Sequence, residues 1–416
     1  MNRLSIVNKT LASMLVLSAL LLTPHTVAAS VKKNAAARVA QFSANLRQDS
    51  EAEAHLIHIY QLIGLGQNRQ ALLASEQLVK AQPNFQLAQL VHGDLLSGFV
   101  RPIQGPGDVT GAVSQPASTV LTELREESQQ RLKALRERPP AGSLPSQFLA
   151  LSPRNKHAIA VDASRSRLYL FENSSAGVKL IADYYISVGK SGIEKLIEGD
   201  LRTPVGVYFI TSNLDPKTLK NFYGAGALPI NYPNPLDTRR GKTGRGIWLH
   251  GTPTEQYSRA PRATDGCVVL ANTDLARIMT TVGIRTTPVV IADKLQWVPA
   301  HSMAAEGAQF SDTLQAWRKA KSKADLSALM GFYTPDFSSY GKNLTQWTKV
   351  LSDDVSKLKG RDFSMAELSM MRWTDKSDTM VVTFDEVPLG MKTGITKRQY
   401  WIREGKFWKI FFEGSI

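Results

Sequence analysis

A single cysteine, Cys267, stands in a chain of 416 residues, directly after Gly266 and before a run of β-prone residues. His250 lies upstream, at the end of the apolar run 247–249 and immediately before Gly251. Cysteine chemistry needs a thiolate, a base that forms it, and backbone N–H groups that hold the oxyanion made when a carbonyl is attacked. Because glycine lets the main chain approach a substrate closely, the amides of Gly266 and Cys267 are candidate oxyanion donors. The pattern predicts acyl transfer with Cys267 as nucleophile and His250 as base.

The same two residues also have a simpler interpretation. Cys267 could be an inert buried thiol, and His250 a histidine whose ring is satisfied at the end of a strand. Composition does not decide between the two, although a single cysteine excludes an internal disulfide and leaves the thiol unpaired. The decision rests on the residues that flank Cys267 and His250.

Three ordered motifs carry a family resemblance. The segments 250–252 (His-Gly-Thr) and 264–267 (Thr-Asp-Gly-Cys) resemble the HG(T) and (S/T)xGC signature of YkuD-type L,D-transpeptidases. The upstream segment 199–208 is similar to that family's TPxGxF/Y segment, and 272–274 (Asn-Thr-Asp) to its (N)xD continuation. The resemblance covers roughly residues 155–293.

The resemblance implies a β-sandwich-like catalytic domain of a peptidoglycan-modifying enzyme. In that family the cysteine attacks the carbonyl of the third stem residue, commonly meso-diaminopimelate, and expels the terminal D-alanine, leaving a thioester. An amine resolves the thioester as a 3-3 cross-link or an attachment to an envelope protein, whereas water resolves it as L,D-carboxypeptidase trimming. His250 would deprotonate Cys267 and shuttle protons in both half-reactions. We predict L,D-transpeptidation, with trimming to the tripeptide as the alternative and an inactive envelope scaffold as the alternative of another class.

Two positions depart from the family pattern. Asp265 and Val269 stand where many members carry His and Arg. They change the charge and the hydrogen bonding beside the nucleophile, which bears on how an acceptor amine is bound. The acyl-donor step depends on them less.

Basic and polar residues near the motifs supply the candidate substrate-binding residues. Arginine suits stem carboxylates, and Arg262 is the preferred candidate, although a solvated basic loop is the commoner explanation for most of the arginines here. Tyr232 either lines the cleft or anchors the Pro-rich turn 231–234. The other residues considered are Thr264, Asp265, Arg239, Arg240, Arg245 and Arg259.

Several domains must position these residues, because 416 residues exceed what one hydrophobic core usually serves. Residue patterns predict an α-helical N-terminal region, a mainly-β catalytic domain and an α+β, cone-like C-terminal domain. The expected boundaries are a signal peptide over 1–29, helices over 30–100, a linker with a charged helix over 101–152, the catalytic domain over 153–293, a linker over 294–307 and the C-terminal domain over 308–416.

The helical region has the spacing of a helix-turn-helix repeat. Its apolar residues recur at helical intervals, and the turn 64–66 (Gly-Leu-Gly) resembles that of a tetratricopeptide repeat. Such a region is either a protein-docking module or a helical hairpin packed on the catalytic domain. His55 and His58 lie one turn apart, but a metal site needs a third ligand, so an ordinary helix surface is favoured.

The C-terminal region resembles a nuclear-transport-factor-2-like cone. The resemblance rests on an amphipathic helix with Trp317, on residues 332–337 and on strand-forming residues 401–410. A YkuD domain followed by such a cone is similar to the arrangement in cell-shape L,D-carboxypeptidases of curved bacteria. The cone's pocket would bind substrate, glycan or a partner, or the domain would brace a dimer or the catalytic domain.

The first residues have the layout of a cleavable signal peptide, with Arg3, Lys9, an apolar run over 11–22 and the sequence Val-Ala-Ala at 27–29. We therefore predict export to the periplasm, without stable membrane insertion after cleavage. A formal net charge of +14 favours polyanionic surroundings, and an export signal makes these the envelope rather than nucleic acid. The predicted partners are peptidoglycan stems, with an envelope protein bound through the helical or C-terminal region as a second candidate. No metal or organic cofactor is expected.

Overall fold

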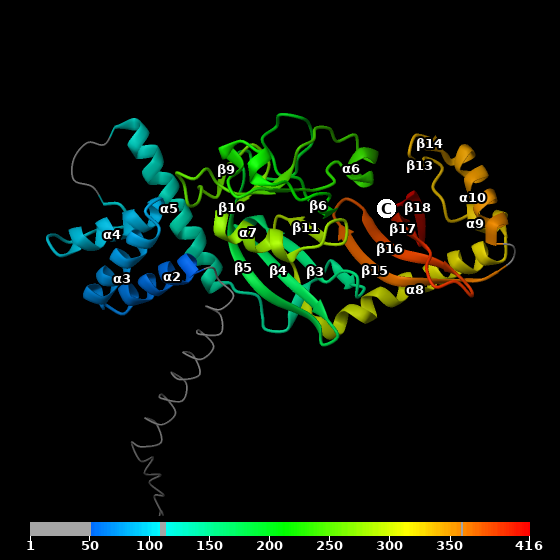
Figure 1. The fold of residues 1–416 in the computed structure, drawn as a ribbon, viewed down its shortest axis with the longest axis horizontal. Coiled ribbons are helices and arrows are strands. Elements are labelled where there is room, and N and C mark those ends of the chain that lie inside the picture. The colour runs from blue at the N-terminus through cyan, green and yellow to red at the C-terminus, as the bar shows by residue number, and fades with distance from the viewer. Residues whose placement is uncertain (1–50, 109–113, 359–360) are drawn as a thin grey trace, which may run out of the picture. The chain divides into compact units, whose positions relative to one another are not determined.

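The computed structural model describes residues 51–108, 114–358 and 361–416 (Figure 1). The expected signal peptide, residues 1–29, lies outside the described residues. Within the described part of the chain, no helix is long and apolar enough to cross a membrane. The predicted fold class is confirmed, because helices come first, a mainly-β domain follows, and an α+β domain ends the chain.

Helices form the N-terminal region, and their apolar faces share one core. The helices are α2 (Glu51–Gly64), α3 (Asn68–Ala81), α4 (Gln86–Gly98) and α5 (Gln115–Arg136). The core is centred on fully buried residues such as Leu56, Leu78 and Phe85. Tyr257 and Ala271, which belong to the catalytic domain, pack in the same core. The helical region is therefore packed on the catalytic domain, as one of the two interpretations predicts.

A twisted sheet forms the catalytic domain, in the strand order β6-β11-β3-β4-β5-β10-β8-β7, with β9 paired to β5 (Figure 1). Its strands are β3 (His157–Asp162), β4 (Arg167–Ser174), β5 (Gly177–Gly189), β6 (Gly206–Phe209), β7 (Ala227–Pro229), β8 (Trp248–His250), β9 (Arg262–Thr264), β10 (Val268–Leu270) and β11 (Pro288–Ala292). Its helices are η1 (Ala163–Arg165), η2 (Pro216–Thr218), η3 (Asn221–Tyr223), α6 (Pro235–Arg239) and α7 (Asn272–Thr281).

Both faces of this sheet are buried. Since side chains alternate along a strand, Ile159 and Leu170 point to one face and Ala160 and Phe171 to the other. The first pair belongs to a core that includes residues of α7, and the second to a core that continues into the C-terminal domain and includes Trp317. Burial on both sides explains why these strands read as near-continuous apolar runs.

The C-terminal domain packs helices against an antiparallel sheet of order β18-β17-β16-β15-β2. Trp317 of the first helix and Trp401 of the sheet are both 0% exposed and form its centre. Lys321 is also buried there, with its ammonium 2.7 and 2.8 Å from the Glu386 carboxylate oxygens. The elements are α8 (Met303–Ser322), α9 (Leu326–Met330), β13 (Ser338–Ser339), β14 (Lys342–Asn343), α10 (Leu344–Leu358), β15 (Phe363–Thr374), β16 (Asp378–Pro388), β17 (Ile395–Glu404) and β18 (Phe407–Ser415).

The two segments expected to be linkers contain strands, which corrects that expectation. The strands are β1 (Ser143–Pro145), β2 (Phe148–Ala150) and β12 (Trp297–Pro299), with η4 (Ala300–Ser302) after the last. β1 pairs with β12, and β2 is the edge strand beside β15. α8 begins at Met303, inside the segment 294–307. Strands of three residues show no periodicity in a sequence, and these are stabilised by partners far along the chain.

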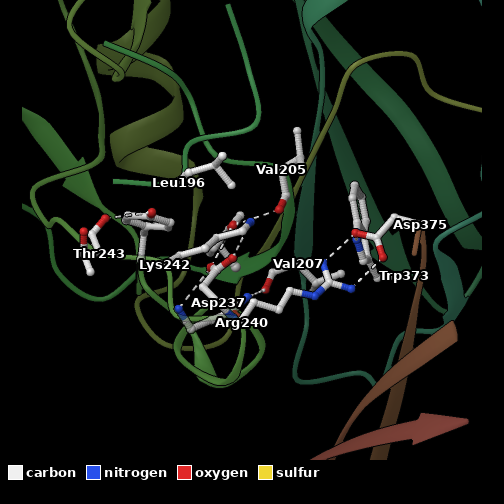
Figure 2. Close-up of polar contacts among 12 residues, drawn as sticks. Leu196, Val205, Val207, Asp237, Arg240, Lys242, Thr243, Trp373 and Asp375 are labelled. Carbon is white, nitrogen blue, oxygen red and sulfur yellow. Dashed lines mark hydrogen bonds and ion pairs between the residues drawn. The ribbon is translucent and has the colours of Figure 1, made fainter. Parts of the chain in front are cut away.

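Two arginines at the end of α6 join the catalytic domain to the C-terminal domain. Arg239 donates two hydrogen bonds to Asp336, at 2.8 and 3.0 Å, and Arg240 donates two to Asp375, at 2.6 and 2.7 Å. Figure 2 shows Arg240 reaching Asp375 beside Trp373, whose indole N–H donates to the same carboxylate at 2.9 Å. Arg239 and Arg240, which the sequence offered as partners for stem carboxylates, are therefore already paired.

Candidate active site

Cys267 and His250 come from adjacent strands of the catalytic sheet. β8 and β10 run parallel, with Val268 opposite Leu249 and Val269 opposite His250. Because side chains alternate between the two faces, Cys267, two residues before Val269, shares a face with His250. The pairing of these two short strands brings together the residues predicted as nucleophile and base.

His250 is an uncharged base in a buried aromatic environment. Its Nδ1 lies 2.7 Å from the Gly251 carbonyl oxygen. A carbonyl oxygen only accepts, so Nδ1 carries the proton and Nε2 keeps the lone pair. The ring centroids of Phe222 and Tyr223 lie 5.6 and 5.1 Å from that of the imidazole. Burial, together with the charge of Arg259, lowers the pKa of His250 to about 4, against the opposing effect of the Gly251 hydrogen bond.

The thiol of Cys267 is protonated in the resting site. Its side chain is only partly exposed, and Sγ donates to the Gly246 carbonyl oxygen at 3.5 Å. Burial raises the pKa of Cys267 to about 11, although a hydrogen bond with the Trp248 backbone and the charge of Arg259 both lower it. A neutral thiol needs a base that removes its proton during an attack on a carbonyl, and a neutral imidazole can act as such a base. The contact with Gly246 must break for Sγ to reach Nε2.

The TPxG segment, residues 203–206, holds the backbone in front of the nucleophile. Thr203 is fully buried, and its Oγ1 donates to the Gly266 carbonyl oxygen and accepts from the Gly189 N–H, both at 2.9 Å. Gly266 has a φ of +125°, and a Cβ at this position would lie 2.7 Å from the Arg202 carbonyl oxygen. The turn before Cys267 therefore requires glycine for both its backbone angle and its close packing.

The side chain of Thr264 stabilises the same turn through two hydrogen bonds. Its Oγ1 donates to the Cys267 carbonyl oxygen at 2.7 Å and accepts from the Gly266 N–H at 3.1 Å. The Gly266 amide, one of the two expected oxyanion donors, is thus engaged with Thr264 in the resting turn. We retain the Cys267 amide as the candidate donor. Thr264 is buried and shapes the nucleophile turn.

The third motif, residues 272–274, begins α7 and holds the loop that follows His250. The side-chain amide of Asn272 donates to the Thr252 carbonyl oxygen at 2.9 Å, and its Oδ1 accepts from the Ala225 N–H at 2.8 Å. Asp274, two residues after Asn272, is buried. Asn272 therefore joins two loops that leave the catalytic sheet next to the base.

The remaining residues predicted to bind substrate do not form one group. Arg262 is exposed at the start of β9, and Asp265 is exposed and pairs with Lys190 at 3.0 Å. Tyr232 is buried, and its hydroxyl donates to the Thr243 carbonyl oxygen at 3.0 Å. This position of Tyr232 fits the alternative interpretation, an aromatic residue that anchors the Pro-rich turn.

Arg259 stacks on a ring that neighbours His250, although the sequence favours Arg262. Its guanidinium carbon stands 4.8 Å from the centroid of the Phe222 ring, which in turn neighbours His250. Its charge lowers the pKa of both His250 and Cys267. Sequence reasoning named Arg259 only among several arginines and did not name Phe222. The only available signal was a basic segment between the two motifs, which does not distinguish position 259 from 262.

No three or more His, Cys, Asp or Glu side chains come together as a metal site in the ranges that the structure describes. His55 and His58 are both exposed on α2.

The fold and the site define a class of protein. Its members place a cysteine and a histidine on adjacent strands of a mainly-β domain, and an α+β cone follows that domain. The family model for the YkuD L,D-transpeptidase catalytic domain matches residues 156–291. The model for the Cds6 C-terminal NTF2-like domain matches residues 309–414. The chain therefore carries a YkuD-family L,D-transpeptidase catalytic domain followed by an NTF2-like domain, and both resemblances read from the sequence are confirmed.

Solved structures of similar fold include two proteins of bacterial origin. Bd1075 from Bdellovibrio bacteriovorus is 26% identical, with a TM-score of 0.56 over 66% of this chain and 98% of that one. The helical cell shape determining protein Pgp2 from Campylobacter jejuni is 23% identical, with a TM-score of 0.52 over 65% of this chain and 95% of that one. No curated protein matches the chain significantly. The helices α2 to α5 lie outside both family models.

Proposed function

We propose that this protein is a peptidoglycan L,D-transpeptidase-family cysteine acyltransferase of the cell envelope, with Cys267 as nucleophile and His250 as base. The observation that carries the proposal is the register of β8 and β10, which sets the two side chains on one face. The tautomer of His250 adds support, because Nδ1 is held by Gly251 and Nε2 has the lone pair that a base needs.

The first half-reaction is acyl transfer to the enzyme. His250 Nε2 takes the thiol proton while Cys267 Sγ attacks the carbonyl carbon of the third residue of a tetrapeptide stem. A C–S bond forms, and the oxyanion is stabilised by the Cys267 amide. When the tetrahedral intermediate collapses, the C–N bond to the terminal D-alanine breaks and the imidazolium gives its proton to the leaving amine. The products are a thioester on Cys267 and free D-alanine.

The second half-reaction depends on the acceptor. An amine of another stem or of an envelope protein gives L,D-transpeptidation, and water gives a tripeptide stem. In both cases His250 takes a proton from the acceptor and returns it to the Cys267 sulfur as the thioester breaks. Transfer to an amine is the function that we propose.

One observation favours trimming as the second candidate. Val269, at the position where many family members carry arginine, is 2% exposed and lies opposite His250 across the strand pair. A buried valine provides neither charge nor hydrogen bond for an acceptor stem. Water needs no such anchor, so this substitution weakens the amine route more than the hydrolytic one.

Product analysis separates these outcomes. The mature protein is incubated with purified disaccharide-tetrapeptide, and the products are identified by mass spectrometry. Dimers are expected for transfer, and tripeptides with free D-alanine for trimming. Unchanged substrate would contradict the proposed activity and leave the scaffold interpretation.

Two variants test the assigned roles. Cys267→Ala should abolish turnover while leaving the circular dichroism spectrum and the melting temperature unchanged, because the thiol supplies the bond to substrate. His250→Ala should lose at least about a hundredfold of kcat, the usual range for a general base. Turnover that persists in Cys267→Ala would refute the nucleophile, and a wild-type rate in His250→Ala would refute the base.

A further inference from the structure

A groove of about 380 Å³ lies between the N-terminal helices and the catalytic domain. One wall is formed by α4 and α5, with Gln86, Val120 and Glu123, and the other by the loop 253–263, with Ser258 and Arg259. Phe222 also lines the groove. The helices that form this wall belong to the part of the chain outside both family models.

The groove approaches His250 through Phe222. Phe222 lines it, and the Phe222 ring neighbours His250 at 5.6 Å between centroids. Arg259 also lines it, stacked 4.8 Å from the Phe222 ring, and its charge lowers the pKa of Cys267. A molecule that occupies the groove would therefore contact Arg259, a cation whose charge lowers the pKa of Cys267.

The helical region holds the loop that carries Arg259. The ring of Tyr257 stacks on Phe85 with centroids 4.3 Å apart, and the Tyr257 N–H donates to the Asn84 carbonyl oxygen at 3.1 Å. The next residue, Ser258, donates to Glu127 of α5 at 2.7 Å. The helices thus set both the width of the groove and the position of Arg259 within it.

Arg259 is an unpaired cation within the part of the chain that the structure describes, since no carboxylate oxygen there lies within 4.0 Å of its guanidinium. The acidic groups around it are engaged or turned to solvent. Glu127 accepts from Arg131 at 2.7 Å, Asp265 pairs with Lys190, and Glu123 is exposed on α5. An arginine with free donors in a groove next to Phe222 and His250 is suited to a carboxylate.

We infer that Arg259 binds the free carboxylate of the terminal D-alanine of the donor stem. The helices α4 and α5 form one wall of the subsite that holds this D-alanine, which is the leaving group. The inference rests on the proposed function, in which the bond to D-alanine is broken. In such a stem the terminal carboxylate is one residue away from the scissile carbonyl. Arg259 lines the groove and stacks on Phe222, whose ring neighbours His250, so its guanidinium is placed to reach that carboxylate.

The first experiment compares Arg259→Gln with Arg285→Gln, a matched loss of charge at an exposed position of the same domain. Substrates are a tetrapeptide stem and the same stem with its terminal carboxylate converted to an amide. The wild type and Arg285→Gln should prefer the carboxylate, whereas Arg259→Gln should raise KM for it about tenfold and lose the preference, with kcat changed much less. An unchanged preference in Arg259→Gln, or the loss found in Arg262→Gln instead, would overturn the assignment.

A second experiment does not depend on peptide turnover. Cys267 is alkylated with iodoacetate, which is anionic, and with iodoacetamide, which is neutral. The rate ratio of the two reagents should fall several-fold in Arg259→Gln and stay at the wild-type value in Arg285→Gln, because a cation beside the thiolate attracts only the anion. Equal ratios in wild type and Arg259→Gln would overturn the anion subsite. A normal ratio effect in a protein that turns over no stem would refute the proposed function instead.

The contribution of the helices is tested by filling the groove from its far wall. Val120 lines the groove and is 44% exposed on α5, whereas Thr122, also exposed on α5, does not line it. Val120→Trp should raise KM for the tetrapeptide several-fold, and Thr122→Trp should leave it unchanged. Equal KM values for the two variants would show that the leaving residue does not occupy this groove.

Discussion

The catalytic domain contacts its two neighbours through different chemistry. Toward the helices, the contact is a buried charge network. Arg131 of α5 is 2% exposed, binds both Glu53 and Glu127, and lies 3.9 Å from the ring centroid of Tyr185. Arg167 of β4 donates to Glu53 at 2.7 Å. This network is cut off from water on both sides of the contact.

Toward the C-terminal domain, the ion pairs at the end of α6 are partly hydrated. The side chains of Arg240 and Asp375 are 24% and 26% exposed, and Arg239 pairs with the half-exposed Asp336. Charges that water can reach interact weakly, whereas a buried ion that loses its partner is strongly unfavourable.

The two contacts also differ in what they reach. The helices contact Ser258 and Tyr257, which come just before Arg259 in the sequence. The ion pairs of Arg239 and Arg240 lie at the end of α6 instead. From this difference we expect the helices to influence both stability and catalysis, and the arginine pairs at the end of α6 to affect stability slightly and catalysis not at all. Four measurements test this difference.

The largest effect is expected for Arg131→Met. The substitution leaves Glu53 and Glu127 buried without their shared cation, which should lower the free energy of unfolding by about 3–5 kcal/mol. Lys133→Met on the exposed side of the same helix should change it by less than about 0.5 kcal/mol. Urea titration followed by circular dichroism measures both. Equal stability of the two variants would mean that the network does not hold the helices on the catalytic domain.

A smaller effect is expected for Ser258→Ala, which removes the hydroxyl that joins the catalytic loop to α5. Glu127 keeps its hydrogen bonds from Arg131, so the cost should be near that of one ordinary hydrogen bond, about 1 kcal/mol. If this energy holds Arg259 in place, kcat/KM for the tetrapeptide falls about fivefold. Ser377→Ala removes the matching hydroxyl at the C-terminal contact, where Ser377 accepts from Arg240 at 2.6 Å, and should leave kcat/KM unchanged. A similar loss in both variants would remove the distinction between the two contacts.

The sequence predicts the centre of the site better than its surroundings. Cys267 and His250 are identified by adjacent glycines and by the ends of apolar runs, which are local signals. The role of Thr203 is not local, because its hydroxyl bridges Gly189 and Gly266, residues on either side of it that are distant in sequence. The motif could be recognised from the sequence, but the bridge that it makes could not.

The choice between Arg259 and Arg262 shows the same limit. Both are arginines of one basic segment, so composition and spacing treat them alike. The main chain of Arg259 is held by Tyr185, whose hydroxyl donates to its carbonyl oxygen at 2.9 Å, and by the neighbouring contact of Ser258 with α5. These partners lie 74 and 131 positions away along the chain. Tertiary contacts of this range decide which arginine stacks on Phe222, next to His250.

The strands β1 and β2 were missed for a related reason. Each has three residues, too few to show alternation, and their neighbours are rich in Pro, Gly and Ser. Their partners β12 and β15 lie in the second expected linker and in the C-terminal domain. The strands β15 to β18 are long enough to show a strand pattern within their own sequence. The C-terminal sheet could therefore be predicted from the sequence.

Asp375→Asn tests the C-terminal contact directly. The amide keeps an acceptor for the indole N–H of Trp373 but removes the charge that pairs with Arg240. Partial exposure limits the expected loss to about 0.5–1 kcal/mol of unfolding free energy, with no change in kcat/KM. A fall in kcat/KM would mean that the arginine pair at the end of α6 does transmit to the catalytic pair.

The smallest effect is a shift in the pH dependence of catalysis. His250 is the base only when neutral, and burial lowers its pKa to about 4, so kcat/KM should be lost as the pH falls through about 4. The positive charge of Arg259 lowers this pKa, so Arg259→Gln should raise it and move the acid limb to higher pH by a few tenths of a unit. Asp375→Asn, at the other contact, should leave the limb in place. An acid limb that does not move in Arg259→Gln would show that solvent screens the arginine from the imidazole. The helices would then position the loop that carries Arg259 without affecting the pKa of His250 through its charge.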